Sequence, residues 1–478
     1  MNIAHQLRPL QDFRDRLHFL FPQRADALFD LLDALSSNQT ARSPAELSLN
    51  PLFRRTYNSV YDGIQSLRGA PVCDPASVAA GATFHQQVTQ LIGARLPQPT
   101  RRPFWLFGVD VTPTPRPYAR TLADRTFVYQ PNPIGANKPV TVGHAYSVVA
   151  ALPEKATHET PSWVVPLTTE RVASTQTAVQ VGVAQTQRLL NDPALPFHHA
   201  LCVEVADSAY GGPGFLSPLA RQPNLVVVAR ARNNRVFYRA PPTGLAPVGH
   251  PTWYGDAMGL NQPTTWTPPD EVQTSSWTTR HGKTFTVRLE AWYDLRMRGH
   301  RDQPMHDYPF TLMRVQLFDA TGLPLHARPL WLVACGARRR ELTLVDLWQA
   351  YQARYDLEHY FRFGKQRLLT TAYQTPAVPH EENWWRLTQL AYVQLWLVRD
   401  AVTACPRPWE RSQPVPAMTS ASPSTAQRRF AEIVRQIGTP AAAPKPRGNP
   451  RGRATGTRPA PRPRQPVVKK GQPAAVLV

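Results

Sequence analysis

The sequence is poor in cysteine and acidic residues and has no long apolar run. Four cysteines, Cys73, Cys202, Cys335 and Cys405, are far apart and form no Cys-x2-Cys pair. This spacing argues against a disulfide framework or a zinc site and suits a reducing cytoplasm. No stretch of 18 apolar residues is present, which excludes an ordinary transmembrane helix. The N-terminus lacks the basic-then-apolar layout of a signal peptide. We therefore expect a cytoplasmic protein with no membrane partner.

The charge balance is strongly basic. The 478 residues include 54 Lys and Arg against 33 Asp and Glu, a formal charge of +21 with a pI near 10.3. A surplus of that size indicates a polyanionic partner, and we expect association with the nucleoid. Apolar residues make up 42% of the chain, which is enough to build a core. The length predicts two to four structural units.

The first 100 residues are predicted to be helical. Apolar residues recur at helical spacing in the first 35 residues, and further helices are expected over about 50–67, with Asn50 as N-cap, and 76–92. From Phe104 the pattern changes to short β-rich runs, and residues 101–233 predict three strands, then helix, strand, helix and strand. This order indicates an α/β layer fold.

The second half of the chain contains an interruption and a tail. Residues 234–325 are rich in Trp, Thr and Pro and predict a mostly β insertion. Residues 326–405 return to the core with a strand and two helices, over about 342–369 and 381–402. Periodicity is lost from Pro406, and residues 439–478 contain nine Lys or Arg, nine Pro and no acid. Such a composition predicts a disordered basic tail over 406–478.

One stripe of the helix predicted over 342–369 carries polar side chains. At about 100° per residue, Tyr351, Arg354, Glu358 and Lys365 share a stripe roughly 60° wide at the border of the apolar face. A solvated face with helical ion pairs would look the same, and such a pair stabilises a helix by only about 0.3–0.5 kcal/mol. The stripe alone does not identify a site.

Two aspartates strengthen the case for a site. Asp110 ends an apolar run in "FGVDVTP", and Asp207 ends another in "VEVADSAY". Each could simply begin a turn or cap a helix. If the two strand ends share an edge, Asp110, Asp207 and Glu358 could instead form one cluster of oxygen ligands. Such a cluster suits two Mg²⁺ or Mn²⁺ ions about 3.5–4 Å apart, which can promote in-line phosphoryl transfer.

The same residues resemble a known family. The spacing Tyr351-x2-Arg354-x3-Glu358-x6-Lys365 resembles the signature around the third acid of DDE transposases from bacterial insertion sequences. "GVDVT" and "ADSAY" resemble the motifs around the first and second acids. The stretch between Asp207 and Glu358 resembles the insertion domain of this subgroup. The resemblance covers roughly residues 100–400. It implies a ribonuclease-H-like core, a two-metal site and cut-and-paste movement of DNA.

The resemblance also implies roles for individual residues. Asp110, Asp207 and Glu358 would hold the metals, and Tyr351, Arg354 and Lys365 would contact phosphates near the cleaved end. In this family a tryptophan of the insertion stacks on a flipped base. The candidates are Trp253, Trp266 and Trp277, and each could equally be a core residue. Residues 1–100 would bind transposon ends or dimerise, and a homodimer is expected on the double-stranded terminal inverted repeats and target DNA.

Two other functions remain open from the sequence. A ribonuclease-H-like nuclease or resolvase would share the three acids but would not join strands. A DNA-binding protein derived from a transposase would have lost catalysis, although all three acids are present here.

Overall fold

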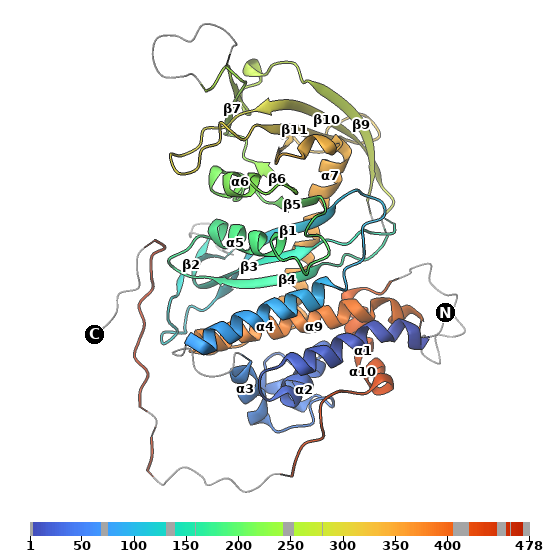
Figure 1. Cartoon of the computed structure of the whole chain (residues 1–478), viewed down its shortest axis with the longest axis vertical. Coiled ribbons are helices and arrows are strands. Elements are labelled where there is room, and N and C mark those ends of the chain that lie inside the picture. Colours follow the sequence, from blue (N-terminus) through green and yellow to red (C-terminus); the bar gives the residue numbers. More distant parts are fainter. Residues whose placement is uncertain are drawn as a thin grey trace.

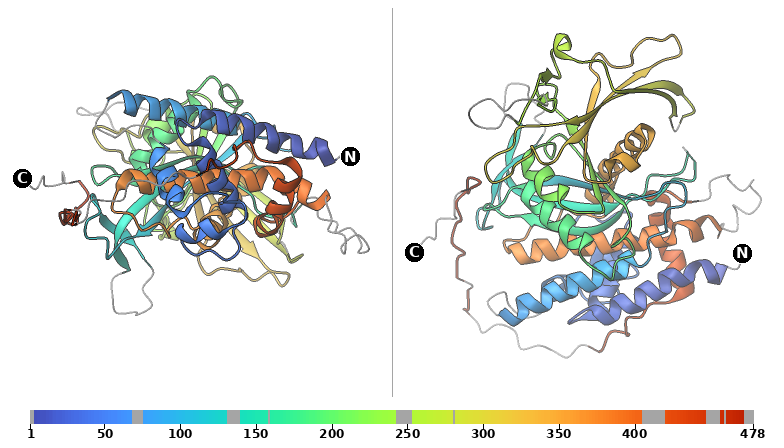
Figure 2. Two further views of the ribbon diagram at one scale, coloured as in Figure 1. Left: turned by 90° about the horizontal axis from the view of Figure 1, so that it is seen from below. Right: turned by 45° about the horizontal axis from the view of Figure 1, so that its top comes forward.

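The computed structural model describes residues 3–67, 75–130, 139–157, 159–241, 253–279, 281–404, 420–446, 456–458 and 460–471. One large sheet runs through the molecule, with helices on its faces and a helical layer at one end (Figure 1). The right view of Figure 2 shows the same separation between a β-rich end and a helical end. No helix in the described ranges is long and apolar enough to cross a membrane.

The main sheet contains ten strands in the order β2-β3-β1-β5-β6-β12-β11-β10-β9, with β4 paired to β3. The strands of its first part are β1 (Trp105–Pro115), β2 (Thr126–Tyr129), β3 (Val140–Ala151), β4 (Val165–Val172), β5 (Cys202–Ala206) and β6 (Leu225–Ala231). Strand β5 is parallel to β1 and β6, whereas the other pairs are antiparallel. Three antiparallel strands followed by parallel ones agree with the α/β expectation and are compatible with a ribonuclease-H-like core.

The β-rich stretch after β6 extends this same sheet. Its long strands are β9 (Glu271–Thr278), β10 (Thr284–Leu295) and β11 (Phe310–Phe318), and β11 pairs with β12 (Leu330–Cys335). A small second sheet contains β7 (Val236–Tyr238) and β8 (Ala257–Gly259). The prediction of mostly β structure agrees with these strands. Because β12 joins β11 to β6, the stretch is continuous with the core sheet.

The local sequence explains where the helices of the core begin. Helix α5 (Ala178–Leu190) begins with a capping box between Thr177 and Gln180, and α6 (Pro213–Ala220) begins with a proline in its first turn. The long helix predicted over 342–369 is divided into α7 (Leu344–Ala353) and α8 (Tyr355–Arg367). The two are separated at Arg354, where hydrogen bonds from Arg354 N to Tyr351 O and from Leu357 N to Arg354 O tighten the turn.

The helical layer is formed mainly by the N-terminal residues and α9 (Val378–Ala404). It contains α1 (Ile3–Leu20), α2 (Ala25–Ser36), α3 (Tyr57–Ser66) and α4 (Pro75–Gly93), with a short 3₁₀ helix at Ala45–Leu49. The helix predicted to start at Asn50 instead starts at Tyr57. The Asn50 side chain accepts a hydrogen bond from Leu52 N, which favours a turn over a helix start. Short 3₁₀ turns also occur at Pro263–Thr265 and Arg339–Glu341.

Helix α10 (Pro423–Ile437) corrects the prediction that regular structure ends at Pro406. Ser422 caps the helix and Pro423 occupies its first turn, a good helix start that the surrounding prolines obscure in the sequence. Its buried face, which includes Phe430 and Ile433, packs mainly on α9. The parts of the predicted tail at 406–419, 447–455, 459 and 472–478 lie outside the described residues.

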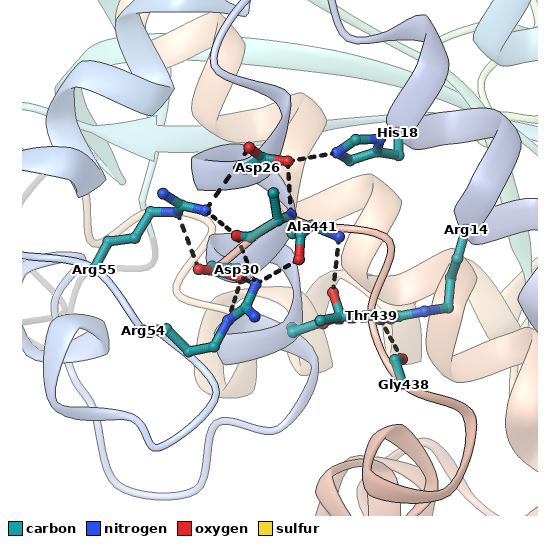
Figure 3. Close-up of polar contacts among 11 residues, drawn as sticks. Arg14, His18, Asp26, Asp30, Arg54, Arg55, Gly438, Thr439 and Ala441 are labelled. Atoms are coloured by element: carbon teal, nitrogen blue, oxygen red, sulfur yellow. Dashed lines mark hydrogen bonds and ion pairs between the residues drawn. The ribbon is translucent and has the colours of Figure 1, made fainter. Parts of the chain in front are cut away.

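The chain after α10 is held against the N-terminal helices by charged side chains (Figure 3). Arg54 Nη2 lies 2.7 Å from Asp30 Oδ1 and donates to Ala441 O at 2.9 Å. Ala442 N donates to Asp26 Oδ1 at 3.0 Å. Arg14 pairs with the buried Asp33 and also contacts Gly438 O at 3.4 Å. These contacts fasten residues 438–442 to the folded body.

We predict that Phe430→Ala destabilises the protein by about 3–5 kcal/mol, the usual cost of removing a buried phenyl ring. Phe430 is 0% exposed on α10. Urea unfolding followed by circular dichroism measures the loss, and Arg435→Ala, at an exposed position of the same helix, is the control. Equal stability of the two variants would show that α10 is not part of the core.

Candidate active site

Strand β1 places Asp110 in the middle of the sheet. The strand lies between β3 and β5, and its apolar residues up to Val109 are buried. Asp110 pairs with Val148 of β3, and its Oδ1 accepts a hydrogen bond from Val111 N at 2.8 Å. The side chain is 17% exposed. A carboxylate in this position is largely removed from water, which is costly unless a partner or a cation compensates.

The register of β5 brings Asp207 to the same place. Val109 of β1 pairs with Ala206 of β5 in parallel orientation, so the next residue of each strand is an aspartate. Asp207 Oδ1 accepts from Ala209 N at 2.8 Å, which opens the turn after β5. The carboxyl end of a parallel strand is where ligand sites in α/β sheets usually form.

Helix α8 brings Glu358 over this edge. Gly108 of β1 makes the approach possible, because a Cβ there would lie only 2.7 Å from Leu357 Cδ1. Leu357 is fully buried, and the following residue, Glu358, has a side chain that is 42% exposed. The helix thus packs through Leu357 and carries Glu358 at the border of the buried face, as the stripe predicted.

Arg354 connects the first and third acids. Its Nη2 donates to Glu358 Oε1 at 3.0 Å, and its Nη1 lies 3.7 Å from Asp110 Oδ2. The guanidinium also lies 5.7 Å from the centre of the Tyr351 ring. Arg354 lies at the tight turn between α7 and α8. The break between the helices therefore directs its guanidinium toward the carboxylates of Asp110 and Glu358.

Burial and neighbouring charges shift the pKa values of groups in the cluster. Burial raises the pKa of Asp110 to about 6; the charges of Asp207 and Glu358 also raise it, whereas the Val111 amide and Arg354 lower it. Burial lowers the pKa of Lys365, and the charge of Asp110 opposes that shift. Three acids and two cations from distant parts of the sequence therefore act on one another.

The donor set fits a hard divalent cation in its chemistry. Three carboxylates offer the oxygen ligands that Mg²⁺ and Mn²⁺ prefer. Burial and, to a smaller extent, the charges of Asp207 and Glu358 disfavour the ionised form of Asp110, and a bound cation would offset both effects. Within the described ranges, however, no three His, Cys, Asp or Glu side chains already form a metal-holding group. Arg354 engages Glu358 instead. Asp110, Asp207 and Glu358 are the residues that would hold metal once that ion pair opens.

Arg230 is a site candidate that the sequence analysis missed. It follows Ala229, which pairs with Ala206, so the parallel register continues from Asp207 to Arg230. The Arg230 side chain is exposed. Burial raises the pKa of the Tyr351 phenol, and the charge of Arg230 reduces this rise. A Cβ at Gly211 would lie 2.6 Å from Arg230 O, so this glycine lets the turn after Asp207 press against β6. The only signal in the sequence is an arginine interrupting the apolar run "NLVVVARA".

The three candidate tryptophans differ in their surroundings. Trp266 packs edge-to-face on Trp331 at 5.2 Å and donates to Gly259 O at 2.7 Å, which is the environment of a core residue. Trp277 is half-buried and stacks on Phe285 at 5.7 Å. Trp253 is 43% exposed and lies parallel to the His306 ring at 4.1 Å. A role in base stacking stays a prediction, and Trp253 has the most exposed ring of the three.

A fourth acid lies in the sheet beneath the cluster. Glu204 of β5 is 0% exposed, and its Oε1 accepts from Thr186 Oγ1 at 2.7 Å. Its Oε2 has no hydrogen-bond partner in the described structure. Burial raises the pKa of Glu204 to about 8. The side chain is therefore protonated near neutral pH and adds no charge to the cluster.

Comparison with known proteins identifies one family for this chain. A family described as "DDE superfamily endonuclease" matches residues 16–295, more than half of the 478 residues. The match covers Asp110 and Asp207 but ends before Glu358. No curated protein matches the chain.

We predict that Glu204→Gln removes a pH-dependent loss of stability. The folded-state pKa is raised from 4.5 to about 8, so the stability contribution is full below pH 4.5 and is lost as pH rises toward 8. The loss is of the order of a few kcal/mol at about 1.36 kcal/mol per pKa unit. Thermal unfolding from pH 5 to 9 should show a flatter profile for Glu204→Gln, whereas Glu341→Gln at the surface should follow wild type. Parallel wild-type and Glu204→Gln profiles would contradict the buried, protonated carboxyl.

Proposed function

Since the chain belongs to the DDE superfamily endonuclease family, we propose that it is a transposase of the insertion-sequence type. It would cut DNA at the ends of its own element and join the freed 3′-OH to target DNA. The observation that carries this proposal is the β1–β5 register, which sets Asp110 beside Asp207 under Glu358. The Tyr351–Arg354–Glu358–Lys365 spacing supports the narrower assignment to transposases.

Each side chain of the cluster has a task in this reaction. Divalent cations held by the three acids would activate the attacking oxygen and stabilise the leaving one. Lys365 and Arg230 are cations at the edge of the cluster that can bind the phosphates flanking the cleaved bond. Arg354 can exchange its bond to Glu358 for one to a phosphate, which would free the carboxylate at the moment DNA arrives. Tyr351 orients Arg354 through its ring.

The second candidate is an endonuclease that only hydrolyses DNA. The description of the matched family favours it, because that description names cleavage and not strand transfer. The two functions differ in the fate of the 3′-OH. Incubation of a cut, end-labelled fragment with a supercoiled plasmid separates them: a labelled plasmid product indicates a transposase, and its absence indicates a nuclease.

We predict that Asp110→Ala, Asp207→Ala and Glu358→Ala each abolish Mg²⁺-dependent plasmid nicking while DNA binding is retained. The expected loss exceeds about 100-fold, because even the outer-shell partners of metal ligands contribute about 10–100-fold. Glu341→Ala, which removes an exposed acid paired with Arg338, is the matched control. Nicking at near wild-type rate by any one of the three variants would remove that residue from the site.

We predict that Lys365→Ala weakens binding to cleaved ends and reduces the salt dependence of binding. Loss of one phosphate contact should lower the slope of log K against log salt by about 0.9. Arg367→Ala is the control, because Arg367 is exposed and lies about 180° around α8 from Glu358. Identical slopes for both variants would make Lys365 an ordinary surface lysine.

A further inference from the structure

The last described segment, residues 460–471, lies along the folded body in an extended conformation, and we call it the C-terminal arm (Figure 1). Three backbone hydrogen bonds hold it: Gln465 N to Arg120 O at 2.8 Å, Val468 N to Arg125 O at 2.8 Å, and Gly471 N to Ser174 O at 3.0 Å. The donors are three residues apart, the period of a polyproline helix, and Pro461, Pro463 and Pro466 favour that conformation. From Gln465 to Gly471 the same side of the arm therefore faces the body. This docking corrects the prediction that these residues are disordered.

Two buried side chains anchor the arm. Val468 is 7% exposed and Arg125 is 4% exposed. Arg125 donates to Gln465 O at 3.2 Å, and it also donates to Leu122 O at 3.2 Å and Arg116 O at 3.3 Å. One guanidinium thus fixes the loop after β1 and the arm that lies on it. The charges carried by the arm are held in place by these contacts.

The arm carries cations that form no ion pair with any residue of the described ranges. The exposed basic residues here include Arg458 just before the arm, and Arg462, Arg464 and Lys469 within it. None of these four forms an ion pair with a described residue. No acidic residue occurs from 439 onward. Unpaired cations along an extended backbone match the repeating phosphates of a nucleic acid strand.

The loop and strand on either side of Arg120 and Arg125, to which the arm is bonded, expose three aromatic rings. Tyr118 of the loop after β1 is 91% exposed, and Phe127 and Tyr129 of β2 are 55% and 61% exposed. Phe127 and Tyr129 alternate with buried residues, so both rings lie on the same face of β2. Leaving large aromatic side chains in water is unfavourable, and a group of them marks an interaction surface. Proteins that bind single-stranded nucleic acid stack its bases on exposed aromatic rings and neutralise its phosphates with nearby cations.

We propose that the C-terminal arm with Tyr118, Phe127 and Tyr129 forms a second DNA-binding surface, which takes a strand with unpaired bases. This arm surface deepens the proposed function, since it presupposes DNA as the substrate. It is distinct from the acidic cluster, because the loop at Arg116 begins about 20 Å along β1 from Asp110 at about 3.3 Å per residue. It would hold a strand away from the bond being cut. The docked arm acts here as a fixed part of the surface and not as a free tether.

The test measures binding of labelled dT20 and of a 20-base-pair duplex to the full-length protein by fluorescence anisotropy in EDTA. Arg464→Gln/Lys469→Gln should weaken dT20 binding and lower its salt slope by about 1.4, which is about 0.7 for each phosphate contact. Arg428→Gln/Arg435→Gln, exposed on α10, makes the same charge change as a control. Tyr118→Ser/Phe127→Ser should weaken dT20 binding tenfold or more, leave its salt slope unchanged and leave duplex binding unaffected.

A third variant separates a docked arm from a flexible one. Val468→Asp places a charge in the buried anchor and should release the arm, which faster trypsin cleavage at Lys469 would report. Release should weaken dT20 binding as much as the charge variant does. Wild-type affinity in Val468→Asp with a released arm would overturn the proposal, as would unchanged dT20 binding in either of the other two variants. No step requires cleavage, so failure here is distinct from failure of the transposase assignment.

Discussion

The parallel pairing of β1 with β5 is the constraint on which the site depends. With Val109 opposite Ala206, the two strands deliver Asp110 and Asp207 to one edge of the sheet. A shift of one residue would turn one carboxylate to the other face, because side chains alternate along a strand. The register is fixed by burial, since Val205 and Ala206 of β5 and Val109 of β1 are wholly enclosed. Packing of the apolar core therefore determines the geometry of the charged site.

Helices α7 and α8 pack over the edge of the sheet that carries Asp110 and Asp207. Gly108 allows α8 to approach, and the tight turn at Arg354 directs a guanidinium between Asp110 and Glu358. Burial raises the pKa of Asp110, and the charges of Asp207 and Glu358 add to that rise because like charges repel one another. Arg354 offsets part of this repulsion, and in the proposed function a divalent cation would take over that task. In the proposed function, the same negative field that makes the cluster costly would attract a divalent cation.

The sequence predicted the elements that have strong local signals. The strands carrying Asp110 and Asp207, the capped helix α5 and the polar stripe of α8 could all be found from periodicity, turn residues and spacing. Features that depend on tertiary contacts could not. Arg230 is marked only by its register with Asp207, and the packing of the half-buried Trp266 against the core is visible only in its contact with Trp331. Helix α10 and the docked arm lie in proline-rich sequence, where composition suggests disorder although packing and Arg125 order the chain.

Localised cleavage of the polypeptide tests most directly whether the three acids share a metal. Fe²⁺ bound in place of Mg²⁺ generates hydroxyl radicals with ascorbate and peroxide, and these cut the backbone close to the ion. If the acids form one site, the cuts fall near Asp110, Asp207 and Glu358 together, and excess Mg²⁺ suppresses all three. Cuts confined to other segments, or cuts near the acids that Mg²⁺ does not suppress, would show that these carboxylates do not bind metal as a unit.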